Sequence, residues 1–124
     1  MGRTVLIVDD AEFMRLMLRE IVADLGLAVV AEAGDGFAAL SAWRRTRPDL
    51  VLMDISMPNM DGIAAVRAIR GDDPSARIVM IGALGQKDEV LDAVKAGACD
   101  FIVKPFDHER VRETLARVLA AVPA

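Results

Sequence analysis

The sequence lacks a hydrophobic stretch long enough to cross a membrane and has one cysteine among its 124 residues. A membrane span needs about 18 or more consecutive apolar residues, so we expect none here. No charged and then apolar leader precedes the first apolar run. A lone thiol cannot form an internal disulfide, and Cys99 has no metal-ligand spacing around it. These absences favour a cytoplasmic location and an ordinary structural role for Cys99.

Basic clusters are absent as well. No run of Lys or Arg is longer than the pair Arg44-Arg45, and the net charge is −4. Because nucleic-acid-binding domains usually carry a basic stripe, we expect no direct binding of nucleic acid. The sequence also has no linker and no low-complexity tract. Its 54% hydrophobic and 27% charged residues are typical of a globular protein. We therefore expect residues 1–124 to form a single domain.

Five short aliphatic runs bounded by turn residues predict strands. They lie at Val5–Val8, Ala28–Ala33, Leu50–Met53, Arg77–Ile81 and Phe101–Val103. After each run, apolar residues recur at helical spacing, which predicts five helices, the fourth over Asp88–Ala96 and the last marked by Val111 through Val122. We expect Asp10 to cap the first helix, Gly26 to end it, and Gly71–Pro74 to break the third.

Strands that alternate with helices at this spacing favour an α/β fold. Parallel strands need a crossover connection, usually a helix, so the sheet is expected to be parallel and doubly wound with five strands.

Acidic residues and a lysine stand where the predicted strands end. Asp9 and Asp10 follow the first strand, Asp54 the third, and Lys104 the fifth. The carboxyl ends of parallel strands share one edge, where open α/β folds bind their ligands, so we expect these side chains to meet. Carboxylates about 4 Å apart repel by several kcal/mol per pair at a dielectric of ~20. A hard cation such as Mg²⁺ would offset this repulsion, although Asp10 alone would be explained as a helix cap or a solvated acid.

Three separated motifs resemble those of response-regulator receiver domains, and among these the CheY-like single-domain chemotaxis type. They are Val-Asp-Asp-Ala-Glu from Val8, Leu-Met-Asp-Ile-Ser-Met-Pro-Asn-Met-Asp-Gly from Leu52, and Gly-Ala-Cys-Asp-Phe-Ile-Val-Lys-Pro-Phe from Gly97. The resemblance spans essentially the whole chain. It implies the family's flavodoxin-like (βα)5 topology with strand order 2-1-3-4-5.

The resemblance also implies roles for the residues at the strand ends. Asp54 would accept a phosphoryl group from a phosphohistidine of a histidine kinase, forming an acyl phosphate. Asp10 and Asp54 would hold Mg²⁺ directly, Asp9 would hold it through water, and Ser56 would contribute its carbonyl oxygen. Lys104 would pair with the phosphoryl oxygens as a point charge. The protein would then catalyse only its own phosphorylation and dephosphorylation, and would not be an enzyme with a separate substrate.

The resemblance also gives roles to residues around the site. Pro105 would follow a cis peptide bond that aims Lys104 inward. Gly62 would allow a backbone shape that other residues resist. In this family the residues two beyond the phosphoacceptor and two beyond the switch hydroxyl, here Ser56 and Leu84, flank the path of attacking water and tune the phosphate lifetime. The direction of their combined effect stays open, as does a purely structural role for each.

One position departs from the family pattern. Receivers of this type usually end the fourth strand in Ser or Thr, but this chain has Gly82. One charge-assisted hydrogen bond to the phosphoryl group, worth about 1.5–3 kcal/mol, would be missing. We therefore expect weaker coupling of phosphorylation to the surface, and a stronger response in a Gly82→Ser variant. Phe101 stands where the switch aromatic is often Tyr, and its ring keeps the ability to rotate.

The implied output is phosphorylation-dependent binding of another protein, with a flagellar motor-switch protein as the favoured target. The expected face comprises residues 86–96, 100–103 and 107–122. Two alternatives stay open: a pseudo-receiver that binds partners without phosphorylation, and an excised receiver of a DNA-binding regulator. A haloacid-dehalogenase-type enzyme is disfavoured because Ser56 stands where its second acid is needed. A flavodoxin-type flavin site is disfavoured because Asp9 and Asp10 would repel the flavin phosphate.

Overall fold

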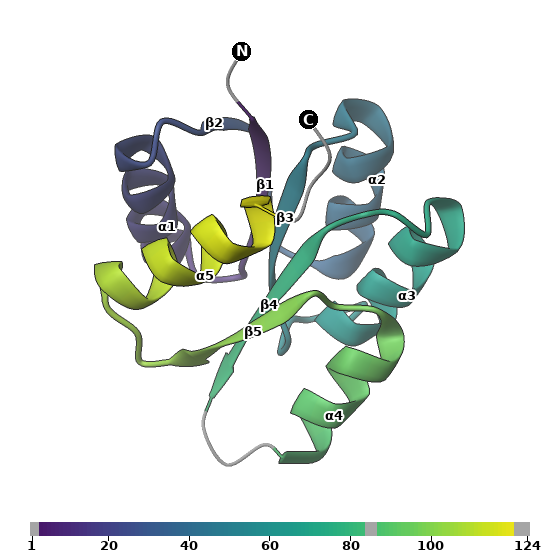
Figure 1. Cartoon of the computed structure of the whole chain (residues 1–124). Coiled ribbons are helices and arrows are strands. Elements are labelled where there is room, and N and C mark those ends of the chain that lie inside the picture. The colour runs from purple at the N-terminus through teal and green to yellow at the C-terminus, as the bar shows by residue number, and fades with distance from the viewer. Residues whose placement is uncertain (1–2, 84–86, 121–124) are drawn as a thin grey trace.

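The fold is a parallel sheet with helices on both faces (Figure 1). The computed structural model describes residues 3–83 and 87–120. The strands are β1 (Thr4–Val8), β2 (Ala28–Ala33), β3 (Leu50–Asp54), β4 (Ile78–Ala83) and β5 (Asp100–Lys104). The helices are α1 (Glu12–Asp24), α2 (Gly36–Thr46), α3 (Gly62–Asp72), α4 (Lys87–Ala96) and α5 (His108–Ala120). The strand order β2-β1-β3-β4-β5 confirms the predicted fold class.

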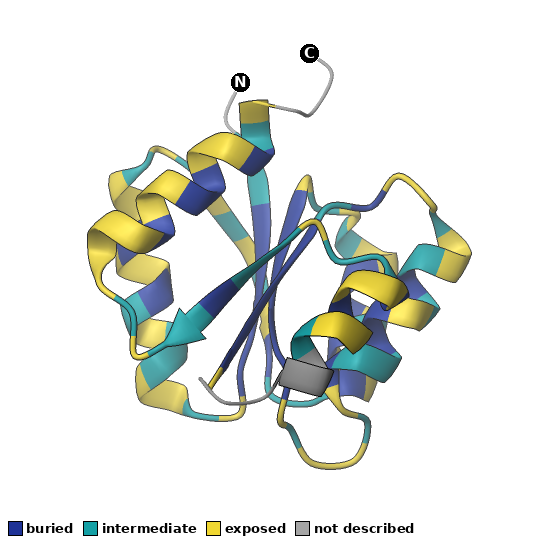
Figure 2. Ribbon diagram, turned by 60° about the horizontal axis from the view of Figure 1, so that its bottom comes forward, coloured by how far each residue is buried: buried dark blue, intermediate teal, exposed yellow. Residues whose placement is uncertain are grey.

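Two hydrophobic layers hold the helices on the sheet. Side chains alternate along each strand, so Val5 and Ile7 face α1 and α5, whereas Leu6 and Val8 face α2, α3 and α4. The central strands are buried on both faces, and the helices expose only their outer sides (Figure 2). No helix in the described part of the chain is long and apolar enough to cross a membrane.

Side-chain caps begin α2, α3 and α5, the last through Asp107, whose carboxylate accepts the N–H of Arg110 at 2.8 Å, but not α1, where one was expected. The cap residue of α1 is Ala11, which makes no side-chain cap hydrogen bond, so the prediction that Asp10 caps this helix is wrong. Instead, the carboxylate of Asp9 accepts the backbone N–H of Ala11 at 2.9 Å. Asp35 and Asp61 do cap α2 and α3, through bonds of 2.8 Å to backbone N–H groups. These caps start both helices beside the edge where β1 and β3 end.

Several predicted boundaries need correction. α3 runs through Gly71 to Asp72, because an interior glycine weakens a helix by only about 1 kcal/mol and Pro74 lies beyond its end. β4 begins at Ile78, one residue later than predicted, and extends to Ala83, since its last residues pair with β5. Gly26 ends α1 with a φ of +77°, as predicted. Val122, expected on the last helix, lies outside the described residues.

Candidate functional site

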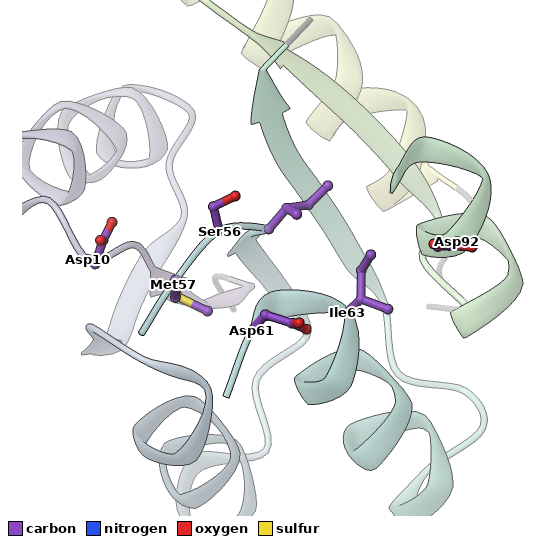
Figure 3. A pocket seen from close by; sticks show the side chains of 7 residues that line it. Asp10, Ser56, Met57, Asp61, Ile63 and Asp92 are labelled. Atoms are coloured by element: carbon purple, nitrogen blue, oxygen red, sulfur yellow. The ribbon is translucent and has the colours of Figure 1, made fainter. Parts of the chain in front are cut away.

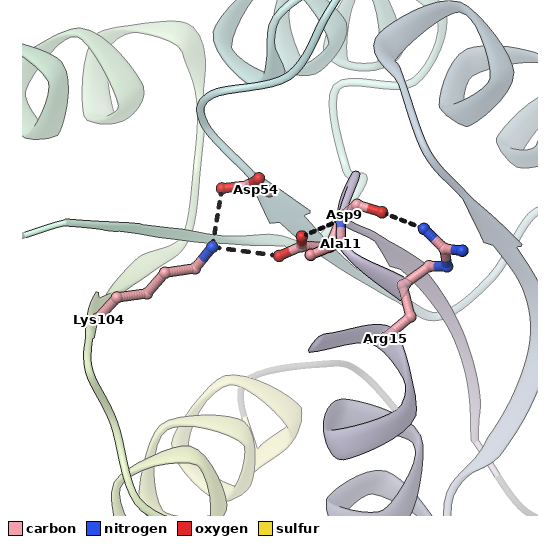
Figure 4. Close-up of polar contacts among 5 residues, drawn as sticks. All are labelled: Asp9, Ala11, Arg15, Asp54 and Lys104. Atoms are coloured by element: carbon pink, nitrogen blue, oxygen red, sulfur yellow. Dashed lines mark hydrogen bonds and ion pairs between the residues drawn. The ribbon is translucent and has the colours of Figure 1, made fainter. Parts of the chain in front are cut away.

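Three strands bring their polar end residues to one edge of the sheet. Asp54 is the last residue of β3, Lys104 is the last residue of β5, and Asp9 follows β1 directly. Val8 pairs with Met53 in the register, so Asp9 lies level with Asp54. The predicted convergence of these side chains is therefore present in the structure (Figure 4).

The carboxylates form a compact cluster. Asp9, Asp10 and Asp54 each offer an oxygen atom, and these atoms lie within 4.8 Å of one another. Asp9 and Asp54 are 1% and 4% exposed, whereas Asp10 is exposed. The Nζ atom of Lys104 donates to Asp9 Oδ2 at 3.2 Å and to Asp54 Oδ1 at 3.3 Å. Since one ammonium faces three carboxylates, the cluster keeps a surplus of negative charge, and its oxygen donors fit a hard divalent cation.

The pKa values at the site follow from burial and from these charges. Burial chiefly, and the negative charge of Asp9 next, raise the pKa of Asp54 to about 6, although Lys104 acts in the opposite direction. Burial lowers the pKa of Lys104, but the carboxylates of Asp54 and Asp9 outweigh this effect and raise it above its ordinary value. Near neutral pH, Asp54 is therefore mainly an ionised carboxylate beside a protonated lysine, which suits it to act as a nucleophile.

A cavity of about 570 Å³ lies beside the acid cluster and gives a ligand access to it. Asp10 and Asp92 lie on opposite sides of this cavity, with Ser56 between them (Figure 3). The remaining lining residues come from the loop after β3 and the start of α3: Ile55, Met57, Asp61 and Ile63. Ser56 is exposed on the cavity wall, next to the strand end that carries Asp54.

Gly62 lies at the end of the loop after β3, and glycine is needed there for a different reason than the sequence suggested. Its φ is not in the left-handed region, where the glycines of the described residues are Gly26 and Gly97. Instead, a Cβ atom at Gly62 would overlap the carbonyl oxygen of Asp54. Its N–H donates to the carbonyl of Ile55 at 2.8 Å. Glycine is therefore needed here for close backbone approach and not for an unusual φ.

The expected switch positions lie on β4, on β5 and directly after β5. Gly82 is buried in β4, and the space beside its Cα is filled by the ends of the Phe101 and Ile55 side chains. The peptide bond between Lys104 and Pro105 is cis. Leu84 lies outside the described residues.

Two residues at this edge were not anticipated from the sequence. Asp92 lines the cavity from α4, and Arg15 of α1 donates to the backbone carbonyl of Asp9 at 2.6 Å. Neither has a local signal, because a charged residue on a helix is usually a solvated surface residue.

Known proteins are similar to this chain in both sequence and fold. The family model for the response regulator receiver domain matches residues 5–116. The chemotaxis protein CheY of Bacillus subtilis (strain 168) is 50% identical over 119 residues, which cover 96% of this chain and 99% of CheY.

Solved structures of other proteins are similar to this chain as well. The crystal structure of the CheX–CheY–BeF₃–Mg²⁺ complex from Borrelia burgdorferi contains a chain with a TM-score of 0.91 and 38% identity, over 94% of this chain and 89% of that one. NtrX from Brucella abortus matches with a TM-score of 0.90 and 33% identity, over 97% of this chain but 28% of NtrX. A domain of this kind thus also occurs within a longer protein.

Proposed function

The chain belongs to the response regulator receiver domain family, and on that basis we propose that Asp54 accepts a phosphoryl group from a histidine kinase in a chemotaxis two-component system. The observation that carries this proposal is the position of Asp54. Its nearly buried carboxylate ends β3, lies 3.3 Å from the ammonium of Lys104, and borders an open cavity through its neighbours Ile55 and Ser56. CheY relatives of nearly the same length support the chemotaxis assignment.

The chemistry is a transfer of a phosphoryl group from nitrogen to oxygen. A carboxylate oxygen of Asp54 attacks the phosphorus of the phosphohistidine, the P–N bond breaks, and its electron pair leaves with the imidazole nitrogen of the donor. Lys104 already lies between two carboxylates, so its ammonium can shift to the new phosphoryl oxygens without crossing the site. Positioning and charge neutralisation therefore account for the reaction.

A Mg²⁺ ion fits the donor set of this site. Asp10 and Asp54 would hold it directly, Asp9 through water, and the carbonyl of Ser56 would complete the protein ligands. When bound, the ion would neutralise negative charge on the phosphoryl group. The repulsion among the three carboxylates is the physical reason that the folded protein would favour this ion.

Loss of the phosphoryl group by water attack would end the signal. The protein would thus catalyse only its own phosphorylation and dephosphorylation. Ser56 borders the cavity beside the acid cluster, and we propose that it tunes the phosphate lifetime together with Leu84.

The output would be binding of a protein target, with a flagellar motor-switch protein favoured by the CheY relatives. The face formed by α4, β5 and α5 exposes two large apolar side chains, Leu91 and Val94, at 53% and 59%. Phosphorylation would shift a pre-existing equilibrium toward the binding-competent form, with Gly82, Phe101 and Pro105 at the switch. We place the protein in the cytoplasm, because donor, receiver and target must share one compartment.

Intact mass spectrometry tests the proposal. The protein is incubated with acetyl phosphate and Mg²⁺, beside an Asp54→Ala variant and a sample with the metal chelated. A phosphoryl adduct that requires both Asp54 and metal is expected. Absence of an adduct, under conditions that label a standard receiver, would overturn the proposal.

A pseudo-receiver is the second candidate function, and one observation favours it. Glycine at position 82 carries no hydroxyl to read the phosphoryl group, and the Phe101 and Ile55 side chains fill the space beside it. Such a module would bind partners without phosphorylation and would give no adduct in the experiment above. The alternative of a receiver excised from a longer regulator is supported only by the match to 28% of NtrX, a longer protein.

A further inference from the structure

Arg15 links α1 to the end of β1, close to the acid cluster but outside it. Its Nη1 donates to the carbonyl oxygen of Asp9 at 2.6 Å, and its Nε lies 3.5 Å from Oε1 of Glu32 (Figure 4 shows the first contact). Glu32 lies on β2, where it pairs with Ile7 of β1 in the register. The arginine side chain is 21% exposed, so it lies largely within the protein. The planar guanidinium suits this place, because its donors have a fixed fork geometry.

Asp9 is held at each of its polar groups. Its N–H donates to the carbonyl of Ala33 at 3.1 Å, and its carboxylate accepts from the N–H of Ala11 at 2.9 Å and from Lys104 at 3.2 Å. The remaining group is its carbonyl, which accepts from Arg15. A buried carbonyl requires a partner, and here a charged side chain supplies it. Arg15 thus completes the set of bonds that fixes this residue.

The carbonyl of Asp9 also determines where Asp10 begins. The peptide group between the two residues is planar, so the direction of the Asp9 carbonyl sets the direction of the Asp10 nitrogen and Cα. Asp10 is the exposed member of the acid cluster, and the position of its backbone limits where its carboxylate can lie. We propose that Arg15 is a positioning residue of the divalent-cation site, which orients the Asp9–Asp10 peptide so that all three carboxylates converge. This inference rests on the proposed Mg²⁺ site.

Arg19 provides a matched control within the same helix. Its Nε pairs with Oε2 of Glu32 at 2.9 Å, so both arginines contact the same glutamate. Arg15 also donates to the carbonyl of Asp9, whereas the described bonds of Arg19 go to Glu32, and the Arg19 side chain is more exposed, at 47%. A variant at Arg19 therefore disturbs the glutamate pair without releasing the carbonyl of Asp9.

The experiment measures Mg²⁺ affinity by isothermal titration calorimetry in the wild type, Arg15→Gln, Arg15→Lys and Arg19→Gln. Loss of a group that supports metal ligands typically weakens metal binding about 10–100-fold. We expect a Kd for Mg²⁺ about tenfold higher in Arg15→Gln, a value within about twofold of wild type in Arg19→Gln, and partial recovery in Arg15→Lys. Urea unfolding determines how much of each variant is folded. If Arg15→Gln does not fold, the Mg²⁺ affinity of Arg15→Lys alone tests the proposal.

A second readout separates positioning from general damage to the fold. The rate of adduct formation with acetyl phosphate is followed as Mg²⁺ is increased. Arg15→Gln is expected to need more Mg²⁺ for half-saturation but to reach the wild-type rate at saturation, since its nucleophile and lysine are intact. Unchanged Mg²⁺ affinity in Arg15→Gln, or equal loss in Arg19→Gln, overturns the inference and leaves the proposed function standing. Absence of Mg²⁺ binding in the wild type overturns both.

Discussion

The ring of Phe101 lies directly against the Cα of Gly82. A Cβ atom added to this glycine would lie 3.0 Å from Cζ of Phe101 and 3.1 Å from Cδ1 of Ile55. At these distances both side-chain ends must yield by a few tenths of an ångström to admit a Cβ. The absence of a side chain at position 82 thus lets the aromatic ring fill space that a serine or threonine would share.

Gly82→Ser is expected to strengthen the response to a phosphoryl group. The new hydroxyl would supply a charge-assisted hydrogen bond of about 1.5–3 kcal/mol, so affinity for beryllium fluoride with Mg²⁺ should rise by at least about tenfold. A titration followed by ¹⁹F NMR measures this affinity in the wild type and in the variant. Gly82→Ala is the control, because it displaces Phe101 and Ile55 equally but adds no hydroxyl. An equal gain in both variants would attribute the effect to the ring displacement and contradict the prediction.

Asp54→Asn is expected to be more stable than the wild type near neutral pH in the absence of metal. Because the folded-state pKa of Asp54 is raised from 3.8 to about 6, the folded protein binds the proton more tightly than the unfolded chain. Stability contributed by this group is therefore present below about pH 4 and is lost as pH rises through about 6. The loss amounts to at most about 3 kcal/mol. Urea unfolding at about pH 7.5 and about pH 4 tests this sign, and a gain that is equal at both pH values would refute it.

Mg²⁺ is expected to stabilise the wild type against urea through the three carboxylates. At a concentration of about 100 times Kd, the gain in unfolding free energy is about 2.7 kcal/mol. Asp10→Asn should lose most of this gain, because it removes one member of the cluster. Asp92→Asn should keep it, since Asp92 lines the same cavity but lies outside the cluster. Equal loss in both variants would indicate general attraction of the cation to acidic surface.

Gly62→Ala is expected to destabilise the protein by about 1–3 kcal/mol or more, because its Cβ would overlap the carbonyl oxygen of Asp54. Relief of this overlap should move the end of β3, which carries Asp54, and slow adduct formation. Gly71→Ala in the same helix is the control. A Cβ there meets no atom within 4 Å, so the change should stabilise the protein by about 0.5–1 kcal/mol. Thermal unfolding compares the two, and similar stability of both variants would contradict the clash at Gly62.

The sequence by itself determined the fold class and the chemical character of the site. Aliphatic runs and helical periodicity depend on local steric preferences, and the second strand, Ala28–Ala33, lies where they predict it. Acids and a lysine at strand ends followed from the same pattern, since parallel strands share one edge. The predicted strand boundaries were wrong where pairing with distant residues overrides local conformational preference. Gly82 and Ala83 extend β4 because they pair with Val103 and Lys104 of β5.

Only the tertiary structure decided how these groups interact. Lys104 meets Asp9 across 95 sequence positions and Asp54 across 50, so neither distance is encoded locally. The same folding buries Asp9 and Asp54 but exposes Asp10, and burial in turn raises the pKa of Asp54. The contacts of Arg15 with Asp9 and of Phe101 with Gly82 likewise depend on packing between elements. Local sequence specifies which groups are present, whereas burial and long-range proximity set their charge, reach and partners.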